Sequence, residues 1–221
     1  MRITIEPFKD GATNMMRDAE LLTAAEFGES AARVYSWDGA WVSLGRFQNP
    51  AKALLDPEAV GWVMRPTGGK AVLHGHDVTV GMAFDLRDIG VSESEARRVS
   101  TVYRRAVAPL VEALTNSGLP AVLAEGTEHV RNAGHTADCF AHVSPNDIVD
   151  PVLGTKVCGC ALRVTQDAVL LQASIPVDEP LIDPAKVFAS PHAFSGRREL
   201  DLERLASELR AATTQAVAVG V

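Results

Sequence analysis

The chain has 221 residues, 47% of them hydrophobic, and a formal net charge of −7, so it is long enough to bury a core without metal or disulfide support. The negative net charge argues against nucleic acid as the main partner, because contacts with phosphate groups need clustered Lys and Arg. We expect a cytoplasmic protein, since the three cysteines follow no signal peptide and no apolar run approaches the roughly eighteen residues of a membrane-spanning helix.

Strand-like runs dominate the first half of the chain. They are short and rich in apolar residues, and they cover residues 1–5, 33–36, 41–44, 61–65, 71–74 and 77–86. An Asp38-Gly39 turn between two of these runs predicts a hairpin, and Gly75 is expected to join another strand pair. Apolar residues at helical spacing predict a helix over residues 14–27, which Gly28 ends.

The second half combines two long helical patterns with a second hairpin. Ser92 and Glu95 form a capping box that predicts a helix over residues 92–117, and Asp201 is placed to cap the last helix. The remaining elements are a strand at 120–124, a loop at 125–137, a hairpin of 156–164 with 168–175, and a helix at 202–217. Strands interspersed with long helices predict an α+β fold, in which a mixed β-sheet is flanked by helices.

Two short runs carry the chemistry of the sequence. The first is Arg65-Pro66-Thr67-Gly68-Gly69-Lys70-Ala71-Val72-Leu73-His74, in which the glycines allow the backbone to approach a ligand and point N–H groups at it. The second starts at Lys156, followed by the small residues Gly159 and Ala161. Together they predict a pocket for an activated acyl group with a fixed cation beside it.

With these motifs the chain resembles the biotin/lipoate protein ligase catalytic-domain family, and its lipoate branch in particular. The resemblance spans residues 12 to 175, with motifs in the family's order. These motifs are Asn14-Met15-Met16-Arg17-Asp18, WVSLGRFQ at 41–48, RPTGGKAVLH at 65–74, Asp138-Cys139-Phe140, Asp147-Ile148-Val149, KVCGCALR at 156–163 and LLQASI at 170–175.

The resemblance implies a mixed sheet with helices around it and an acyl chain under the glycine loop. It implies that Lys156 contacts the acyl carbonyl or an acyl-adenylate and stabilises the charge developing there. The residues that it implies for ligand binding are Arg65, Gly68, Gly69, Lys70, Ala71, His74, Gly159 and Ala161. Of these, Arg65 is expected to point toward a phosphate or pantetheine group.

Two departures from the ligase pattern favour a transferase. Lys70 stands where ATP-using lipoate ligases usually have a third glycine, and the Cys139-Phe140 pair resembles one found in cysteine-dependent octanoyltransferases. A free thiol is mostly protonated at neutral pH, and a cation such as Lys156 would increase its thiolate fraction. Cys139 could then accept an acyl group from a carrier-protein thioester and pass it to a lysine amine without ATP.

More than one interpretation stays open for several residues. Cys139 could be a small buried hydrophobe, and His74 could be structural or act in proton transfer. Cys158 and Cys160 are interpreted as core residues, because Cys-x-Cys alone is weak evidence for zinc. The residues His129, His135 and His142 bracket Cys139, and the sequence spacing does not select any of them as its base.

Arginines face away from the apolar side of the helix predicted over residues 92–117. They are Arg97, Arg98, Arg104 and Arg105. A solvated helix face is the favoured explanation, but a positive patch would also suit acidic carrier proteins and lipoyl domains.

The sequence thus favours an acyltransferase of lipoate assembly, forming residues 1–221 as one catalytic domain without a C-terminal accessory domain. It would move an octanoyl or lipoyl group onto the acceptor lysine of a lipoyl-domain protein through Cys139 and Lys156. The expected donor is octanoyl-acyl carrier protein, with no metal and no tightly bound cofactor, and neither nucleic acid nor membrane as partner. The alternative is an ATP-dependent lipoate-protein ligase that uses ATP, Mg²⁺ and lipoate. A non-catalytic binder and a biotin ligase are less favoured.

Overall fold

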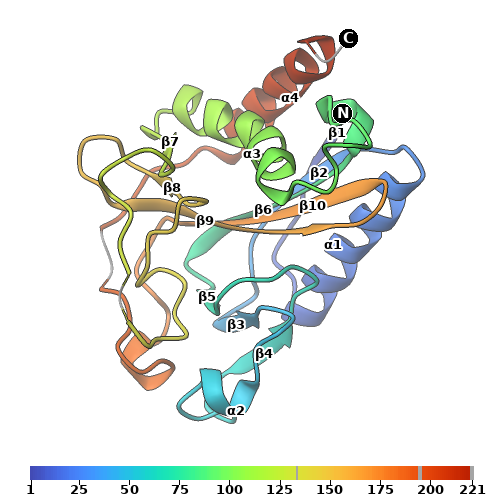
Figure 1. The fold of residues 1–221 in the computed structure, drawn as a ribbon. Helices are drawn as coiled ribbons and strands as arrows, with labels where there is room; N and C mark the ends of the chain where they lie inside the picture. The colour runs from blue at the N-terminus through green and yellow to red at the C-terminus, as the bar shows by residue number, and fades with distance from the viewer. Residues whose placement is uncertain (133, 194–195, 220–221) are drawn as a thin grey trace.

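The computed structural model of the chain describes residues 1–132, 134–193 and 196–219 (Figure 1). In this part of the chain, a seven-stranded sheet has the order β1-β2-β6-β10-β9-β8-β7. Its strands are β1 (Arg2–Ile5), β2 (Ala31–Tyr35), β6 (Asp77–Asp85), β10 (Ala168–Pro176), β9 (Lys156–Val164), β8 (Ile148–Val149) and β7 (Val122–Leu123). β1 and β2 are parallel whereas the other neighbours are antiparallel, so the sheet is mixed.

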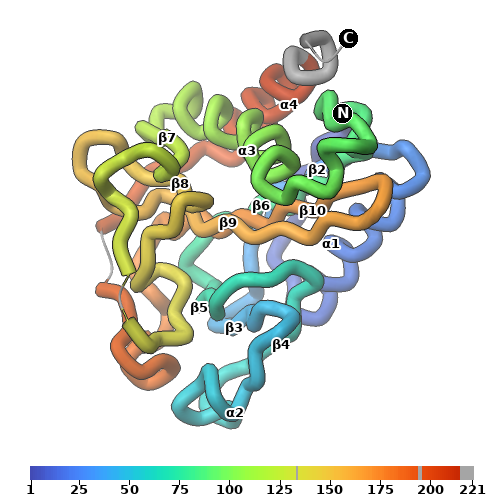
Figure 2. The backbone as a smooth tube through the Cα atoms, viewed as in Figure 1, coloured from blue at the N-terminus to red at the C-terminus, as the bar shows by residue number. Residues whose placement is uncertain are grey.

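A smaller sheet lies below the large one in Figures 1 and 2. Its order is β4-β3-β5, formed by β4 (Gly61–Met64), β3 (Trp41–Leu44) and β5 (Val72–His74). The short helix α2 (Pro50–Ala53) connects β3 to β4, and the 3₁₀ turns are η1 (Leu86–Ile89) and η2 (Pro184–Lys186). The hydrophobic core beside the smaller sheet includes Val42, Leu44, Leu73 and Phe188, all buried.

Helices cover both faces of the large sheet, because successive residues of its strands point to opposite sides. α3 (Val99–Asn116) and α4 (Leu202–Val219) pack on one face, where Leu110 and Leu205 join Met82 and Leu171 in the largest core cluster. α1 (Gly11–Glu26) packs on the other face, where Leu22 meets Leu170, the neighbour of Leu171 in the chain. The predicted α+β class, with a mixed sheet flanked by helices, is therefore confirmed.

The predicted hairpin around Asp38-Gly39 is wrong. β2 lies in the large sheet and β3 in the small one, and the strands on either side of Gly75 are likewise divided between the two sheets. Both turns sit at the crossing, so closely that a Cβ on Gly75 would lie 2.4 Å from the carbonyl oxygen of Gly39. Gly39 and Gly75 therefore do lie in turns, as predicted. Each turn, however, carries the chain from one sheet to the other.

The helix predicted from Ser92 begins seven residues later. Half of the capping box forms, with the Ser92 N–H donating to Glu95 Oε2 at 3.1 Å, but it closes a separate turn before α3 starts at Val99. Arg97 and Arg98 consequently precede the helix, and Val99 at its start is exposed. The arginines are exposed, and Arg104 forms an ion pair with Glu125 at 2.7 Å. Within the described residues, no helix combines the length and apolarity that crossing a membrane requires.

Candidate active site

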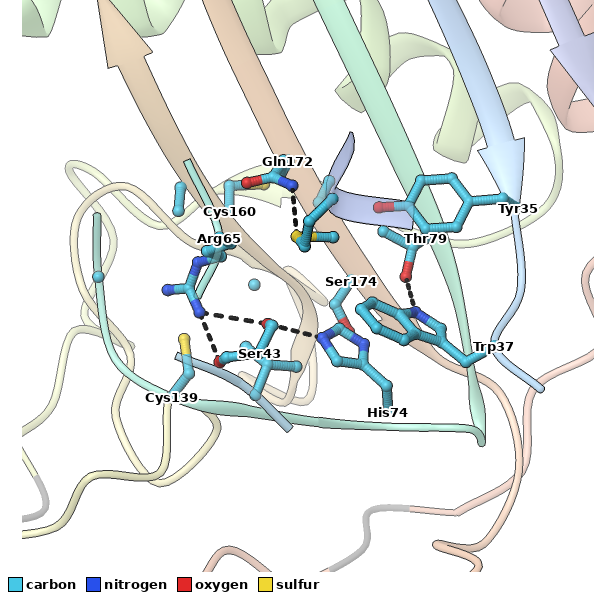
Figure 3. A pocket seen from close by; sticks show the side chains of 16 residues that line it. Tyr35, Trp37, Ser43, Arg65, His74, Thr79, Cys139, Cys160, Gln172 and Ser174 are labelled. Carbon is cyan, nitrogen blue, oxygen red and sulfur yellow. Dashed lines mark hydrogen bonds between the residues drawn. The ribbon is translucent and has the colours of Figure 1, made fainter. Parts of the chain in front are cut away.

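A pocket lies between the two sheets, and its empty space of about 390 Å³ includes its opening to solvent (Figure 3). β9 and β10 of the large sheet supply one wall, and β3 and β5 of the small sheet supply the other. Met15, Tyr35 and Trp37 cluster along it, and the small residues Gly69, Gly159 and Ala161 line it as well. Cys139 also lines it, and Figure 3 shows Tyr35 and Trp37 on the opposite side from this thiol. Nearly all of this lining is apolar, which suits an acyl chain.

The glycine loop is held by Arg65, which is buried below it. Arg65 Nη2 donates to the carbonyls of Gly68 and Lys70, both at 2.6 Å, and Nη1 donates to the carbonyl of Ser43 at 2.8 Å (Figure 3). Burial lowers the pKa of Arg65 to about 10. These bonds make Arg65 a support of the loop, although it also lines the cavity, and its contact with a phosphate or pantetheine group stays a prediction.

Position 69 requires glycine, because its φ of +88° lies in the left-handed region that residues with a Cβ rarely adopt. The loop also presses on Gly45, where a Cβ would lie 2.1 Å from the Gly69 carbonyl oxygen. Ala71 then joins the loop to the Cys139 segment, since its N–H donates to Ala137 and its carbonyl accepts from the Cys139 N–H at 2.8 Å. Two predicted binding segments, 65–74 and 138–140, are thereby brought side by side.

His74 lies in the cavity wall within a buried polar chain. Its Nδ1 is 2.7 Å from Asp77 Oδ2, its Nε2 is 2.8 Å from Ser43 Oγ, and its ring stacks on Trp37 at 3.9 Å (Figure 3). Burial would raise the pKa of Asp77, but His74 and the hydrogen bond from Ser174 outweigh it and lower the pKa to about 2. This arrangement orients the imidazole of His74, although the motif alone assigned no chemistry to Asp77.

Lys156 contacts Cys139, as the sequence hypothesis requires. Its ammonium Nζ lies 2.8 Å from the Cys139 carbonyl oxygen and 3.4 Å from Cys139 Sγ, while Asp147 Oδ2 lies 2.9 Å away. Burial alone would lower the pKa of Lys156, but the Cys139 thiol and Asp147 raise it above its ordinary value. Lys156 is therefore a buried, persistently charged group beside the thiol, whereas its contact with an acyl carbonyl stays a prediction.

Gly159 makes room for this pair. A Cβ at Gly159 would lie 3.3 Å from Lys156 Cε, 3.4 Å from Phe140 Cζ and 3.5 Å from Cys139 Sγ. A larger residue would push against all three groups at once. The glycine at position 159 is thus explained by the space that the side chains of Lys156, Phe140 and Cys139 occupy.

Several residues of the site were missed. Asp147 was quoted only as part of a motif, although it is the ion-pair partner of Lys156. Gln172 joins the cavity wall to the glycine loop, because its Oε1 accepts from Thr67 Oγ1 at 2.6 Å and its amide donates to Asp18. Asp18 is itself paired with Arg33 at 2.8 Å, and a buried ion pair leaves no periodicity that a sequence could reveal.

The other cysteines lie next to each other on β9. Cys158 is buried in the main core, as predicted, whereas Cys160 is half-buried and lines the cavity, and their sulfur atoms are 3.7 Å apart. Among the residues with described positions, no group of three or more His, Cys, Asp or Glu side chains could hold a metal ion.

Comparisons with known proteins identify the family of the chain. Residues 10–199 match the family described as lipoyl protein ligase A/B catalytic domain. Octanoyltransferase LipM of Kyrpidia tusciae is 33% identical over 187 residues, covering 80% of this chain and 65% of that protein. Octanoyltransferase LipM of Symbiobacterium thermophilum is 33% identical over 227 aligned positions, covering 96% of this chain and 76% of that protein. The chain thus spans about two thirds to three quarters of the length of these relatives.

Solved structures share the fold at low sequence identity. A bipartite lipoate protein ligase from Thermoplasma acidophilum superposes with a TM-score of 0.67 at 17% identity, over 98% of this chain and 83% of that one. Lipoate-protein ligase A bound with ATP gives a TM-score of 0.70 at 19% identity, over 98% and 85% of the two chains. The resemblance predicted from the sequence is therefore confirmed, and the chain belongs to the lipoyl protein ligase A/B catalytic-domain family.

Proposed function

We propose that the protein is an acyltransferase of lipoate assembly, which moves an octanoyl or lipoyl group onto the acceptor lysine of a lipoyl-domain protein. The observation that carries this proposal is the contact between the Cys139 thiol and the buried Lys156 ammonium at an apolar cavity under the glycine loop. A thiolate stabilised by a fixed cation is a competent nucleophile toward a thioester. The names of the LipM relatives support the same activity.

The proposed reaction has two half-reactions. In the first, Cys139 attacks the thioester of the donor, octanoyl-acyl carrier protein, and the donor thiol leaves. In the second, the acceptor lysine attacks the acyl-cysteine, so that an amide forms and Cys139 is released. Lys156 stabilises the thiolate before the first step and after the second, and the donor thioester supplies the activation that ATP provides in a ligase. No tightly bound cofactor is needed.

Mass spectrometry tests the proposal directly. Incubation with octanoyl-acyl carrier protein should add one octanoyl group, located on Cys139 and absent from Cys139→Ser. Addition of a lipoyl-domain protein should then discharge the adduct onto its lysine. Absence of an adduct, together with ATP-dependent lipoylation that survives Cys139→Ser, would instead identify an ATP-dependent lipoate-protein ligase using Lys156 and the glycine loop.

A further inference from the structure

One hydrogen bond joins the glycine loop, residues 66–69, to the large sheet. The hydroxyl of Thr67 donates to Oε1 of Gln172, in β10, at 2.6 Å, and both side chains are buried. Since β10 forms the wall of the cavity that faces the small sheet, this bond reaches across from one wall to the other. We refer to it as the Thr67–Gln172 link.

The remaining described hydrogen bonds of the loop come from the side of the small sheet. Arg65, which follows β4, bonds the Gly68 carbonyl, and the Arg46 N–H, which follows β3, donates to the Thr67 carbonyl at 3.0 Å. The next residue, Lys70, points its Nζ away to the carbonyl of Thr136 at 2.7 Å. Within the described part of the chain, the loop is therefore held against the large sheet by the hydroxyl of Thr67.

The direction of each hydrogen bond in the link is fixed by its neighbours. Arg65 Nε lies 3.2 Å from Thr67 Oγ1, and because an arginine can only donate, the hydroxyl hydrogen is left for Gln172. Gln172 must then turn its carbonyl oxygen toward Thr67 and its amide N–H toward Asp18, whose carboxylate only accepts. The link thus has one consistent arrangement, with the Gln172 amide in a single orientation.

Asp18 gives the link a fixed end below helix α1. Its side chain is completely buried and also accepts from Arg33 Nη1 at 2.8 Å and from the Tyr35 hydroxyl at 2.7 Å. Burial raises the pKa of Asp18, whereas Arg33 and the hydrogen bonds from Gln172 and Tyr35 oppose this rise. Three donors hold the carboxyl group in place, so the Gln172 amide is oriented in the ligand-free protein.

The link bears on acyl binding because both groups that it joins belong to the cavity. Gly69 of the loop and Gln172 of β10 line it together with Arg65 (Figure 3). An acyl chain in the cavity consequently contacts the loop, and a loop that is already in position needs no ordering when the chain enters. Without the link, the substrate itself has to order the loop, which lowers the apparent affinity by the fraction of molecules in the binding conformation.

We propose that Thr67 and Gln172 are positioning residues, which hold the glycine loop in its substrate-binding position before the acyl donor arrives. Asp18 acts through Gln172 by fixing the orientation of its amide. This inference rests on the acyl transfer proposed above and adds to it how the cavity is kept ready for the acyl group. The effect of the link falls on substrate binding and leaves the chemical step at Cys139 unchanged.

Single-turnover acylation of Cys139 separates binding from chemistry. The donor is the octanoyl thioester of N-acetylcysteamine, a small molecule that needs no docking of a carrier protein, and mass spectrometry follows the adduct over a series of donor concentrations. Thr67→Val keeps the shape of the side chain but removes the hydroxyl. Gln172→Met keeps the length of the side chain but removes the amide. Thr67→Ser keeps the hydroxyl and is the matched control.

Thr67→Val and Gln172→Met should each raise the half-saturating donor concentration about tenfold, as expected for one lost hydrogen bond to a buried acceptor, and leave the maximal acylation rate within about twofold of the parent. The double variant should match Gln172→Met, because both changes break the same bond. Thr67→Ser should behave like the parent. Parent-like kinetics of Thr67→Val, additive effects in the double variant, or a lower maximal rate at an unchanged half-saturating concentration would each overturn the proposal.

Hydrogen exchange in the ligand-free protein tests the link without any reaction. The Arg46 N–H, bonded to the Thr67 carbonyl, should exchange about tenfold faster in Thr67→Val than in the parent and in Thr67→Ser, because the loop opens more often. Equal exchange in the three proteins would overturn the link even where acyl transfer is observed. A parent protein that forms no adduct on Cys139, whatever its exchange rates, would instead overturn the proposed function.

Discussion

The ion pair between Lys156 and Asp147 should dominate the stability of the site. The two side chains are 1% and 4% exposed and their charged atoms are 2.9 Å apart, so the small contribution typical of surface pairs does not apply. Removing one partner of a buried pair costs roughly 3–5 kcal/mol. We expect the lower end, because Lys156 would keep the Cys139 carbonyl at 2.8 Å, and Asp147 would keep two hydrogen bonds from Ser144 at 2.7 and 3.0 Å.

A double-mutant cycle measures this effect. Asp147→Asn and Lys156→Met should each lower the free energy of unfolding by about 3 kcal/mol, and the double variant by about 3 rather than 6, since it leaves no unpaired buried charge. The coupling energy is then about 3 kcal/mol, obtained from urea unfolding at pH 7. The exposed pair of Arg104 and Glu125, changed to glutamine singly and together, serves as the control with much weaker coupling. If the effects of Asp147→Asn and Lys156→Met add within about 0.5 kcal/mol, the argument from burial is refuted.

Three further predictions concern the cavity and its walls. Gly159→Val should slow the acylation of Cys139 about a hundredfold in single-turnover mass spectrometry, because its methyl groups displace the thiol, and a rate like that of the parent would contradict the tight fit. Met15→Ala should shift the preferred acyl group from octanoyl toward decanoyl or dodecanoyl in competition assays, and an unchanged preference would place the chain end elsewhere. Asp77→Asn should cost about 2 kcal/mol at pH 6, because the native pKa of about 2 lies below the ordinary value. A depressed native pKa contributes stability above the unfolded pKa, so the gap between the two proteins in urea unfolding should shrink as the pH falls from about 4 toward 2, and a constant gap would exclude the charge as its cause.

Local patterns in the sequence predicted most elements but not how the strands are shared between sheets. β9 and β10 pair as a hairpin as expected, because both are long, apolar and joined by a short turn. The strands on either side of Gly75 show the same kind of sequence pattern, but they belong to different sheets. Their separation depends on packing against Gly39, 36 positions earlier in the chain. Short-range patterns contain no information about such a contact.

Single residues of the candidate site could be predicted from sequence motifs. Residues that act by contacting a partner distant in the sequence could not. Lys156 and Cys139 were selected by motif, and they are in contact. Asp147 was not assigned its part, because it reaches Lys156 through the pairing of β8 with β9, and a strand of two residues has no readable register. The shift of the helix start from Ser92 to Val99 has a similar cause, since a capping box satisfies the first turn whether or not the helix continues.

The anchoring of Lys156 has a mechanical consequence. Its ammonium bonds the main-chain oxygen of Cys139, the residue whose sulfur it also contacts, so the cation and the nucleophile are fastened to a single peptide unit. This bond keeps the ammonium and the sulfur of Cys139 close to each other. Their mutual alignment is thus insulated from adjustments of the surrounding surface, which would allow one thiol to receive its cargo from one macromolecule and deliver it to another of different shape.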